Sequence, residues 1–307
     1  MAFLKMLESI RNPVFDAFFS FITAFGEETL FVVIGLLFFW CISKKQGYYL
    51  FFVGLFGTVI NQFLKLYFRI PRPWVKDESF TIVESARAEA AGYSFPSGHT
   101  QSSVGLFGGM SRCRGEKWLR IVCIAMCVLV PLSRMYLGVH TPLDVGVSIL
   151  IALVLIFVLQ PIMNRAIDNP MMMRILIGTM SLLTVGFILF AEFYNFPADL
   201  DMHNYDSGLK NGYKMLGCFL GLWFAYEMDT HFIKFEPIAP FFVQVLKVAG
   251  GLIPILLIKS VLKQPLYAII GNEPIADGIR YFMIAAFAGG VWPFTFKFFN
   301  KLGKKKA

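Results

Sequence analysis

Residues 133–161, SRMYLGVHTPLDVGVSILIALVLIFVLQP, join a short polar segment to a long apolar one. His140 and Asp144 lie four residues apart, which places both side chains on one face of a helix. Thr141 and Pro142 between them are typical of a helix start, with the threonine as cap and the proline in the first turn. After Asp144 the segment carries no charge and is long enough to cross a bilayer as a helix. It therefore predicts a membrane-spanning helix that begins with an imidazole beside a carboxylate.

Three further polar blocks lie at the edges of apolar runs. They are Lys65 with Arg72-Pro73 after six intervening residues, Pro96-Ser97-Gly98-His99, and Ser133-Arg134. The chain has four histidines, and two of them, His99 and His140, lie in these polar segments. With His140 and Asp144, the blocks gather three strong cations, two imidazoles and one carboxylate. Such a collection suits binding a phosphate and breaking its ester bond.

The cations and the helix starts predict a phosphate site. A phosphomonoester carries up to two negative charges, which Lys65, Arg72 and Arg134 can neutralise, and the arginine fork meets two oxygens at once. Ser97 has the character of a helix N-cap, and Gly98 lets the backbone approach an anion closely. The free N–H groups of the following helix then point at the phosphate.

The two histidines divide the chemistry in this interpretation. The Asp144 carboxylate accepts a hydrogen bond from one ring nitrogen of His140 and so fixes the tautomer. The other nitrogen of His140 is then free to attack phosphorus. His99 protonates the leaving oxygen and later takes a proton from water. The expected catalytic residues are therefore His140, Asp144 and His99.

These blocks resemble the three signature blocks of the type 2 phosphatidic acid phosphatase superfamily, in order and without a departure. The matching residues are Lys65-x6-Arg72-Pro73, Pro96-Ser97-Gly98-His99 and Ser133-Arg134-x5-His140-x3-Asp144. The resemblance covers roughly residues 28–160. The longer layout, with extra C-terminal helices, is similar to sphingoid-base phosphate and glucose-6-phosphate phosphatases of this superfamily and to its long bacterial members.

The resemblance also implies a role for each residue. His140 is the nucleophile that forms a phosphohistidine, Asp144 is its orienting partner, and His99 is the general acid and base. Around the phosphate the resemblance implies five residues: Lys65, Arg72, Ser97, Gly98 and Arg134. It implies no metal and no cofactor.

Composition predicts an all-α polytopic membrane protein. The chain is 57% hydrophobic and 16% aromatic, with a mean hydropathy of +0.64, well above a soluble domain. Apolar runs too long and continuous for barrel strands predict a bundle of about eight or nine transmembrane helices. We expect spans near residues 28–43, 47–67, 98–112, 118–137, 141–161, 173–195, 211–230, 238–262 and 279–299. The span 98–112 is short and rich in glycine, which favours close packing.

The distribution of Lys and Arg predicts the orientation. The basic residues of one set of loops are Lys44, Lys45, Arg112, Arg114, Lys117, Arg120, Arg165, Arg174, Lys234, Lys297, Lys301 and Lys304–Lys306. The opposite set holds the acidic segment around Asp199 and Asp201, together with the loop from Lys65 to His99. The positive-inside rule places the first set in the cytoplasm and the phosphate-binding residues on the exoplasmic face, most simply of a plasma membrane. The net charge of +8 therefore indicates membrane orientation and not nucleic-acid binding.

Three regions are expected along the chain. Residues 1–27 carry apolar residues at helical spacing and several charges, which predicts an amphipathic interfacial helix in place of a cleaved signal peptide; the competing interpretation is a weakly apolar, tilted first span. Residues 28–161 form the catalytic core. Residues 162–307 add helices continuous with the core and without a comparable motif. The Lys304-Lys305-Lys306-Ala307 ending is either an orientation anchor or a dilysine retrieval signal.

The most consistent function is removal of a terminal phosphate from a membrane lipid, of phosphatidate, polyprenyl pyrophosphate or sphingoid-base phosphate type. A lipid is favoured because its headgroup lies where the motif residues lie, at span ends. The alternatives are a phosphotransferase with the same site, a phosphatase of soluble esters such as glucose 6-phosphate, an inactive lipid-phosphate-binding protein, and a transporter built on the second half. The oligomeric state stays open.

Several other polar residues have structural explanations. Arg69 is expected to anchor at the interface or contact a headgroup, and His203 and His231 to be solvated or interfacial. Four charged residues in the second half, Glu192, Glu227, Lys247 and Lys259, are expected to pair between helices or snorkel, because unpaired charge in lipid is costly. The five cysteines show no metal-ligand spacing.

Overall fold

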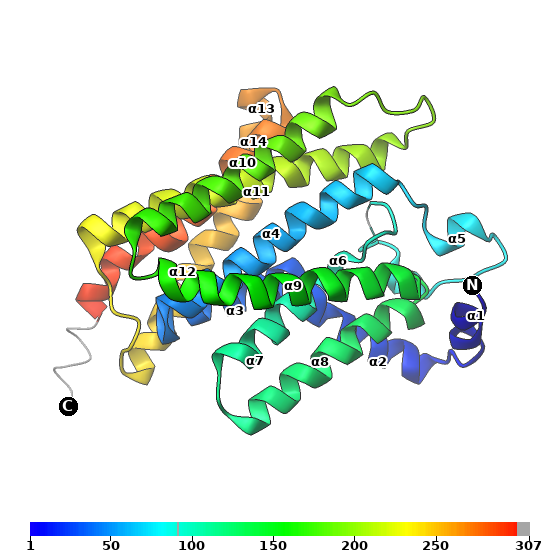
Figure 1. Cartoon of the computed structure of the whole chain (residues 1–307), viewed down its shortest axis with the longest axis horizontal. Helices are drawn as coiled ribbons and strands as arrows, with labels where there is room; N and C mark the ends of the chain where they lie inside the picture. Colours follow the sequence, from blue (N-terminus) through cyan, green and yellow to red (C-terminus); the bar gives the residue numbers. More distant parts are fainter. Residues whose placement is uncertain (91, 300–307) are drawn as a thin grey trace. The chain divides into compact units, whose positions relative to one another are not determined.

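The structure, a computed structural model, describes residues 1–90 and 92–299 and contains no strand in that part of the chain (Figure 1). Six helical segments are long and apolar enough to cross a membrane, and a seventh span is obtained if a bent helix pair is counted as one. The expected all-α, multi-pass membrane protein is therefore confirmed. The lysines at 301 and 304–306, which contributed to the predicted orientation, lie outside the described residues.

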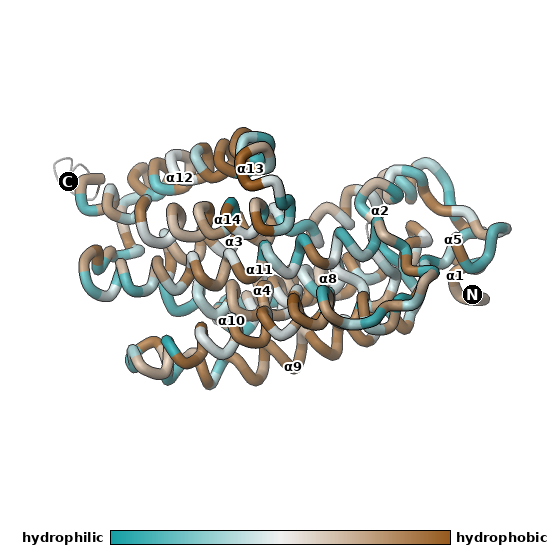
Figure 2. The backbone as a smooth tube through the Cα atoms, turned by 90° about the horizontal axis from the view of Figure 1, so that it is seen from above, coloured by the Kyte–Doolittle hydropathy of each residue, from teal (hydrophilic) through white to brown (hydrophobic). Residues whose placement is uncertain are grey.

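The candidate spans follow most of the expected ones. They are Lys44–Lys76, Lys117–Tyr136, Pro142–Ala166, Pro170–Phe193, Phe241–Val261 and Glu273–Phe299, with Pro13–Gly26 plus Glu28–Ile42 as the pair bent by 52°. Helix α9 (Pro142–Ala166) is the most apolar of them, and Figure 2 shows it hydrophobic along nearly its whole length. Residues 211–230 lie in a longer helix, α11 (Met202–Met228), which carries too many polar residues to meet the same criterion.

The glycine-rich segment near residues 98–112 differs from the expected span. It consists of α6 (Gly98–Ser103), a π-helical turn η4 (Val104–Gly108) and α7 (Gly109–Cys113). At about 1.5 Å per residue these pieces rise about 24 Å, short of a bilayer core of ~30 Å. A side chain at Gly108 would lie 2.7 Å from Ile156, so the glycine allows the close helix packing expected of this segment.

The chain divides into two compact units. The first comprises residues Met1–Val32, Leu50–Gln160 and Asn195–Gly208. Besides α6, η4 and α7, it contains α1 (Ala2–Ser9), α2 (Pro13–Thr23), η1 (Ala24–Gly26), α5 (Pro73–Lys76), η3 (Glu84–Ala86) and α8 (Lys117–Tyr136), with parts of α3 (Glu28–Leu37), α4 (Lys44–Phe68), α9 and α11. Helix α8 is its centre, because α1, α2, α6 and α7 all pack against it. All the expected site residues belong to this unit.

The second unit comprises Val33–Tyr49, Pro161–Tyr194 and Leu209–Ala307. Its further elements are η2 (Phe38–Ile42), α10 (Pro170–Phe193), η5 (Asp229–Ile233), α12 (Phe241–Val261), α13 (Lys263–Ile270), α14 (Glu273–Ala286), η6 (Phe287–Val291) and η7 (Trp292–Thr295). The division into regions 1–27, 28–161 and 162–307 stays a prediction.

Of the charged residues singled out in the second unit, Glu192, Glu227 and Lys247 contact protein groups, and Glu227 forms the expected ion pair. Arg174 binds both carboxylate oxygens of Glu227 at 2.7 and 2.8 Å. Lys247 is fully buried and donates to the main-chain carbonyls of Glu236 and Pro237. The Glu192 carboxylate accepts a hydrogen bond from the Tyr213 hydroxyl at 2.6 Å. These charges are therefore held by protein groups.

The N-terminal region contains two helices where one amphipathic helix was expected. Helix α1 ends at Ser9, and α2 begins at Pro13 with Asn12 as its cap, the Asn12 side chain accepting from two backbone N–H groups. The exposed face of α2 is apolar and includes Val14, Phe18 and Phe21. The break is a consequence of proline, which lacks the N–H needed inside a helix but suits its first turn.

The turn between α8 and α9 determines where the motif residues lie. Gly138 has a φ of +83°, a left-handed conformation that favours glycine and ends α8 sharply. The Thr141 hydroxyl accepts from the Asp144 backbone N–H, and the Asp144 carboxylate accepts from the Thr141 N–H. This capping box confirms Thr141 as cap and Pro142 as the first residue of α9.

Candidate active site

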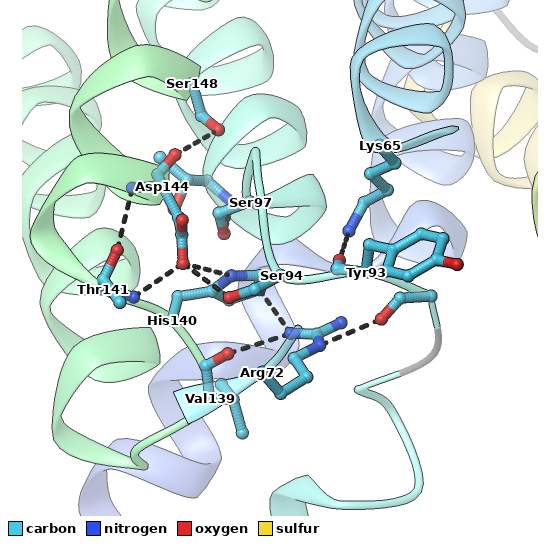
Figure 3. Close-up of polar contacts among 12 residues, drawn as sticks. Lys65, Arg72, Tyr93, Ser94, Ser97, Val139, His140, Thr141, Asp144 and Ser148 are labelled. Atoms are coloured by element: carbon cyan, nitrogen blue, oxygen red, sulfur yellow. Dashed lines mark hydrogen bonds and ion pairs between the residues drawn. The ribbon is translucent and has the colours of Figure 1, made fainter. Parts of the chain in front are cut away.

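His140 and Asp144 lie at the start of α9, both almost fully buried (Figure 3). His140 Nδ1 is 3.6 Å from Asp144 Oδ2, an ion-pair distance slightly beyond a hydrogen bond. Asp144 Oδ2 already accepts from the Thr141 N–H at 2.8 Å and from the Ser94 hydroxyl at 2.6 Å. These two donors thus fix the carboxylate in a position facing His140 Nδ1.

The opposite ring nitrogen of His140 faces Arg72. Arg72 Nη1 lies 3.0 Å from His140 Nε2 and donates to the Val139 carbonyl at 2.9 Å, while its Nε donates to the Gly92 carbonyl at 3.0 Å. An arginine cannot accept a hydrogen bond, so Nε2 is the acceptor and the proton of the neutral ring is on Nδ1, toward Asp144. This is the tautomer expected of a nucleophile that attacks through Nε2.

The charge state of His140 follows from its surroundings. Burial, followed by the guanidinium groups of Arg72 and Arg134, lowers the pKa of the His140 imidazole well below 6.5. The ring is therefore neutral at physiological pH, and its unprotonated nitrogen retains a lone pair. A neutral imidazole is the form that can act as a nucleophile.

The Pro96-Ser97-Gly98-His99 block forms the start of α6. The Ser97 hydroxyl accepts from the Thr100 N–H, which confirms Ser97 as the N-cap. The Ser97 N–H donates to the Asp144 carbonyl at 3.2 Å, so the first turns of α6 and α9 are tied together. A side chain added at Gly98 would meet Asn61 at 4.0 Å and no nearer atom among the described residues, so the space beside this backbone is open.

His99 follows in α6, which lies outside the candidate membrane spans. Its Nε2 is 3.4 Å from Glu89 Oε2. Burial and the nearby Arg134 guanidinium lower the pKa of His99 to about 4, whereas Glu89 raises it. In return, the contact with His99 lowers the pKa of the Glu89 carboxyl below its usual range. His99 is therefore neutral at rest, and added negative charge, such as a bound phosphate, favours its protonation.

Arg134 is fully buried near the C-terminal end of α8. Its Nη1 donates to the Thr23 hydroxyl at 2.7 Å. Its Nε and Nη2 atoms have no hydrogen-bond partner within residues 1–90 and 92–299. Buried charged donors are rarely left unpaired, because their desolvation is costly. The free N–H groups of Arg134 therefore favour an anionic ligand at this position.

Lys65 is buried near the end of α4, and its Nζ donates to the Tyr93 carbonyl. Arg72 donates to the Gly92 carbonyl in the same loop. Lys65, Arg72 and Arg134 all act electrostatically on His140, so the three expected cations gather around one imidazole. In the structure Lys65 contacts the loop backbone, and a phosphate ligand would have to exchange with that contact.

A cleft of about 640 Å³ adjoins this cluster on the side of Arg72. Its lining includes the apolar side chains of Phe68, Trp74 and Val75, and the polar residues Arg69, Tyr93, Asp199, Asp201 and Asn204. Arg69 thus lines the cleft and also faces the Phe196 ring at 5.7 Å. The cleft offers both apolar and polar contacts next to a buried guanidinium.

Four contacts at the site could not be expected from the motifs. They are the hydrogen bond from Ser94 to Asp144, the ion-pair contact of Glu89 with His99, the hydrogen bond from Arg134 to Thr23, and the position of the buried Asn61 amide near Gly98. None of these residues belongs to a motif or to a periodic pattern, so one sequence carries no signal for them. Among the described residues, no three His, Cys, Asp or Glu side chains gather as metal ligands.

The fold and this cluster define a class: a multi-pass membrane protein with a buried group of cations and imidazoles at helix ends. Residues 45–168 match the PAP2 superfamily, and residues 213–305 match the PAP2 superfamily phosphatase transmembrane extension. The chain belongs to the PAP2 superfamily and is a membrane lipid phosphatase of the PAP2 type. The recognition made from the motifs is therefore confirmed.

Three relatives illustrate the range of this family. Over 48% of its length the chain is 30% identical to undecaprenyl-diphosphatase BcrC of Bacillus subtilis and covers 75% of that protein. It is 28% identical to a probable sphingosine-1-phosphate phosphatase of Dictyostelium discoideum, of which it covers 38%. It is 30% identical to the lipid A 4'-phosphatase of Porphyromonas gingivalis, of which it covers 66%. No solved structure matches the chain significantly.

Proposed function

We propose that this phosphatase hydrolyses the terminal phosphate of a lipid phosphate or pyrophosphate at the exoplasmic face of the membrane, through a phosphohistidine on His140 and without a metal. The observation that carries the proposal is the arrangement of His140 between two groups. Asp144 faces its Nδ1 at 3.6 Å, and Arg72 lies 3.0 Å from its Nε2. The nucleophilic nitrogen thus lies beside a cation that can bind the phosphate.

In the first step the substrate phosphate takes the place of His140 as a partner of Arg72. Nε2 attacks phosphorus, the P–N bond forms, and the P–O bond to the lipid breaks with its electron pair on the leaving oxygen. His99 gives its proton to that oxygen, and Glu89 stabilises the imidazolium before transfer. The free N–H groups of Arg134 bind the charge on the equatorial oxygens.

In the second step water completes the hydrolysis. The neutral His99 takes a proton from water, and the water oxygen attacks phosphorus. The P–N bond then breaks, its electron pair returns to Nε2, and inorganic phosphate leaves. Asp144 stabilises the positive ring of His140 while the phosphoryl group is attached.

A lipid is the favoured substrate for two reasons. The cluster lies at the ends of α4, α8 and α9, where a headgroup resides while its tail stays in the bilayer. The adjoining cleft has apolar walls as well as polar ones. The named relatives act on undecaprenyl diphosphate, sphingosine 1-phosphate and lipid A, which supports a lipid phosphate as the class.

The exoplasmic orientation rests on the positive-inside rule. Arg112 at the end of α7, Arg114 in the α7–α8 connection and Lys117 at the start of α8 lie at the opposite end of α8 from Arg134. With these basic residues in the cytoplasm, the turn that holds His140 faces the exoplasmic side. The plasma membrane is the compartment we propose.

Phosphate release from a substrate panel tests the proposal. Purified enzyme in detergent micelles is given polyprenyl pyrophosphate, phosphatidate, sphingoid-base phosphate and glucose 6-phosphate, with His140→Ala as the control for contaminating activity. We expect hydrolysis of at least one lipid in excess chelator, and inhibition by vanadate. Preference for glucose 6-phosphate contradicts the lipid assignment, and a strict requirement for added magnesium contradicts the metal-free mechanism. Transfer of phosphate to an added lipid acceptor, in preference to water, would identify a phosphotransferase.

A further inference from the structure

The N-terminal hairpin, defined as α1, α2 and η1 in residues 2–26, contacts the candidate active site. It lies outside residues 45–168 and 213–305, the two segments that match the family. Helix α2 packs along α8, and η1 packs against α6, the helices that carry Arg134 and His99. The hairpin contains no signature residue, yet it contacts both helices that carry the site residues.

A polar contact between Thr23 and Arg134 joins the hairpin to the candidate active site. Thr23 is the last residue of α2, and its Oγ1 accepts from Arg134 Nη1 at 2.7 Å. Both side chains are buried, with 5% of Thr23 and 0% of Arg134 exposed. Arg134 Nε and Nη2 lack a hydrogen-bond partner in the described part of the chain. The Thr23 hydroxyl thus holds Nη1 of the guanidinium in place, while Nε and Nη2 remain available to a ligand.

The backbone of the hairpin is held close to the site by further contacts. A side chain at Gly26 would lie 3.0 Å from both the Cβ and the carbonyl oxygen of His99, so the glycine backbone approaches α6 closely. At the other end, Arg11 Nε donates to the Tyr136 carbonyl at 3.0 Å, and the Tyr136 hydroxyl donates to Asp16 at 2.8 Å. Thr23 therefore has a defined position relative to α8.

We propose that Thr23 is a positioning residue, which orients the guanidinium of Arg134 so that its free N–H groups face the phosphate. An arginine fork binds phosphate only in a defined orientation, and a buried guanidinium with no fixed corner can rotate away from the oxygens. The proposal rests on the proposed function, because it takes Arg134 as a phosphate ligand. It predicts that the hydroxyl of Thr23 acts on transition-state binding and not on folding.

The test compares Thr23→Val with Thr23→Ser in full-length enzyme. Valine has nearly the shape of threonine but lacks the hydroxyl, whereas serine keeps it. We expect Thr23→Val to lower kcat about tenfold to a hundredfold with little change in KM, and to weaken vanadate inhibition in parallel. Thr23→Ser should restore most of the activity. Thr184→Val is the matched control, since Thr184 is fully buried in the second unit and bonds within its own helix; it should leave kcat unchanged.

A double-mutant cycle separates positioning from packing. Adding Thr23→Val to Arg134→Ala should not weaken orthovanadate binding further, because the hydroxyl then has no guanidinium to orient. Thermal midpoints show whether each variant folds, and Thr23→Ala replaces valine if valine is not accommodated.

Three results would overturn the inference. Wild-type kinetics for Thr23→Val, together with a strong loss for Arg134→Ala, reject the positioning role and leave the proposed function intact. An equal loss for Thr23→Ser, or an additive loss in the double mutant, indicates packing instead. Wild-type activity for Arg134→Ala removes Arg134 from the proposed phosphate site itself, and the inference fails with it.

Discussion

His140 Nε2 lies 3.0 Å from Arg72 Nη1, on the side of the ring opposite to Asp144. The atom proposed to attack phosphorus is thus in contact with a cation proposed to bind the phosphate. When the phosphate oxygens take over Arg72, the lone pair of Nε2 becomes available at the same place. In the proposed mechanism, binding of the substrate phosphate to Arg72 therefore also frees the nucleophilic nitrogen of His140.

Asp144→Asn should retain the fold and lose most of the activity. An asparagine can still accept from Thr141 or Ser94 through its oxygen, but its amide N–H groups favour the wrong tautomer of His140. We expect kcat to fall by roughly two to four orders of magnitude, with a thermal midpoint close to that of the wild type. Activity within a few fold of the wild type would show that Asp144 does not orient His140.

Ser94→Ala should lower kcat about tenfold, because it removes a hydroxyl that donates to the Asp144 carboxylate at 2.6 Å. Ser148→Ala is the matched control. Ser148 is equally buried and donates at 2.8 Å to the same residue, but to its main-chain carbonyl. Steady-state kinetics of the two variants should differ, and equal losses would rule out a specific role for the Ser94 hydroxyl.

Glu89→Gln should shift the pH profile. The Glu89 carboxylate raises the pKa of His99, so the neutral amide should lower it. If protonated His99 is the acid of the first step, the rate falls as pH rises through this pKa, and the falling limb moves to lower pH in the variant. Glu84→Gln, in the same loop but paired with Arg87, should leave the limb in place. A limb that stays fixed in Glu89→Gln excludes Glu89 as the partner of the acid.

Impermeant thiol reagents should locate the site relative to the membrane. In a background without the five native cysteines, cysteines at Glu78–Glu89 should be labelled from outside intact cells. A cysteine at Gly115 should be labelled only after permeabilisation, because the loop around it is rich in Arg and Lys. The reverse pattern would place the site in the cytoplasm.

The sequence could predict those features that depend on neighbouring residues. The helix starts at Thr141 and Ser97 and most of the apolar spans are local patterns, and the structure confirms them. The break before α2 was also predictable, since Asn12-Pro13 is a typical helix start. The helical spacing of apolar residues along 1–27 instead led to the prediction of one continuous helix.

Other features depend on contacts between distant segments. Thr23 and Arg134 are 111 residues apart, and Ser94 and Asp144 are 50 apart. Threonine and serine are common, so nothing in their type or spacing distinguishes these two. For Lys65 the sequence indicated a phosphate ligand, but it could not indicate that Nζ donates to the Tyr93 carbonyl. Only packing brings such pairs together.

The most direct test of the central claim is to trap the covalent intermediate. Enzyme mixed with a ³²P-labelled lipid phosphate for milliseconds is quenched in alkaline denaturant, and the labelled peptide is sequenced. The account predicts an acid-labile, base-stable phosphate on His140. The label should be absent in His140→Ala, and it should persist longer in His99→Ala with a substrate whose leaving group needs no proton. Phosphate release by His140→Ala at the wild-type rate, or label on another residue, would contradict it.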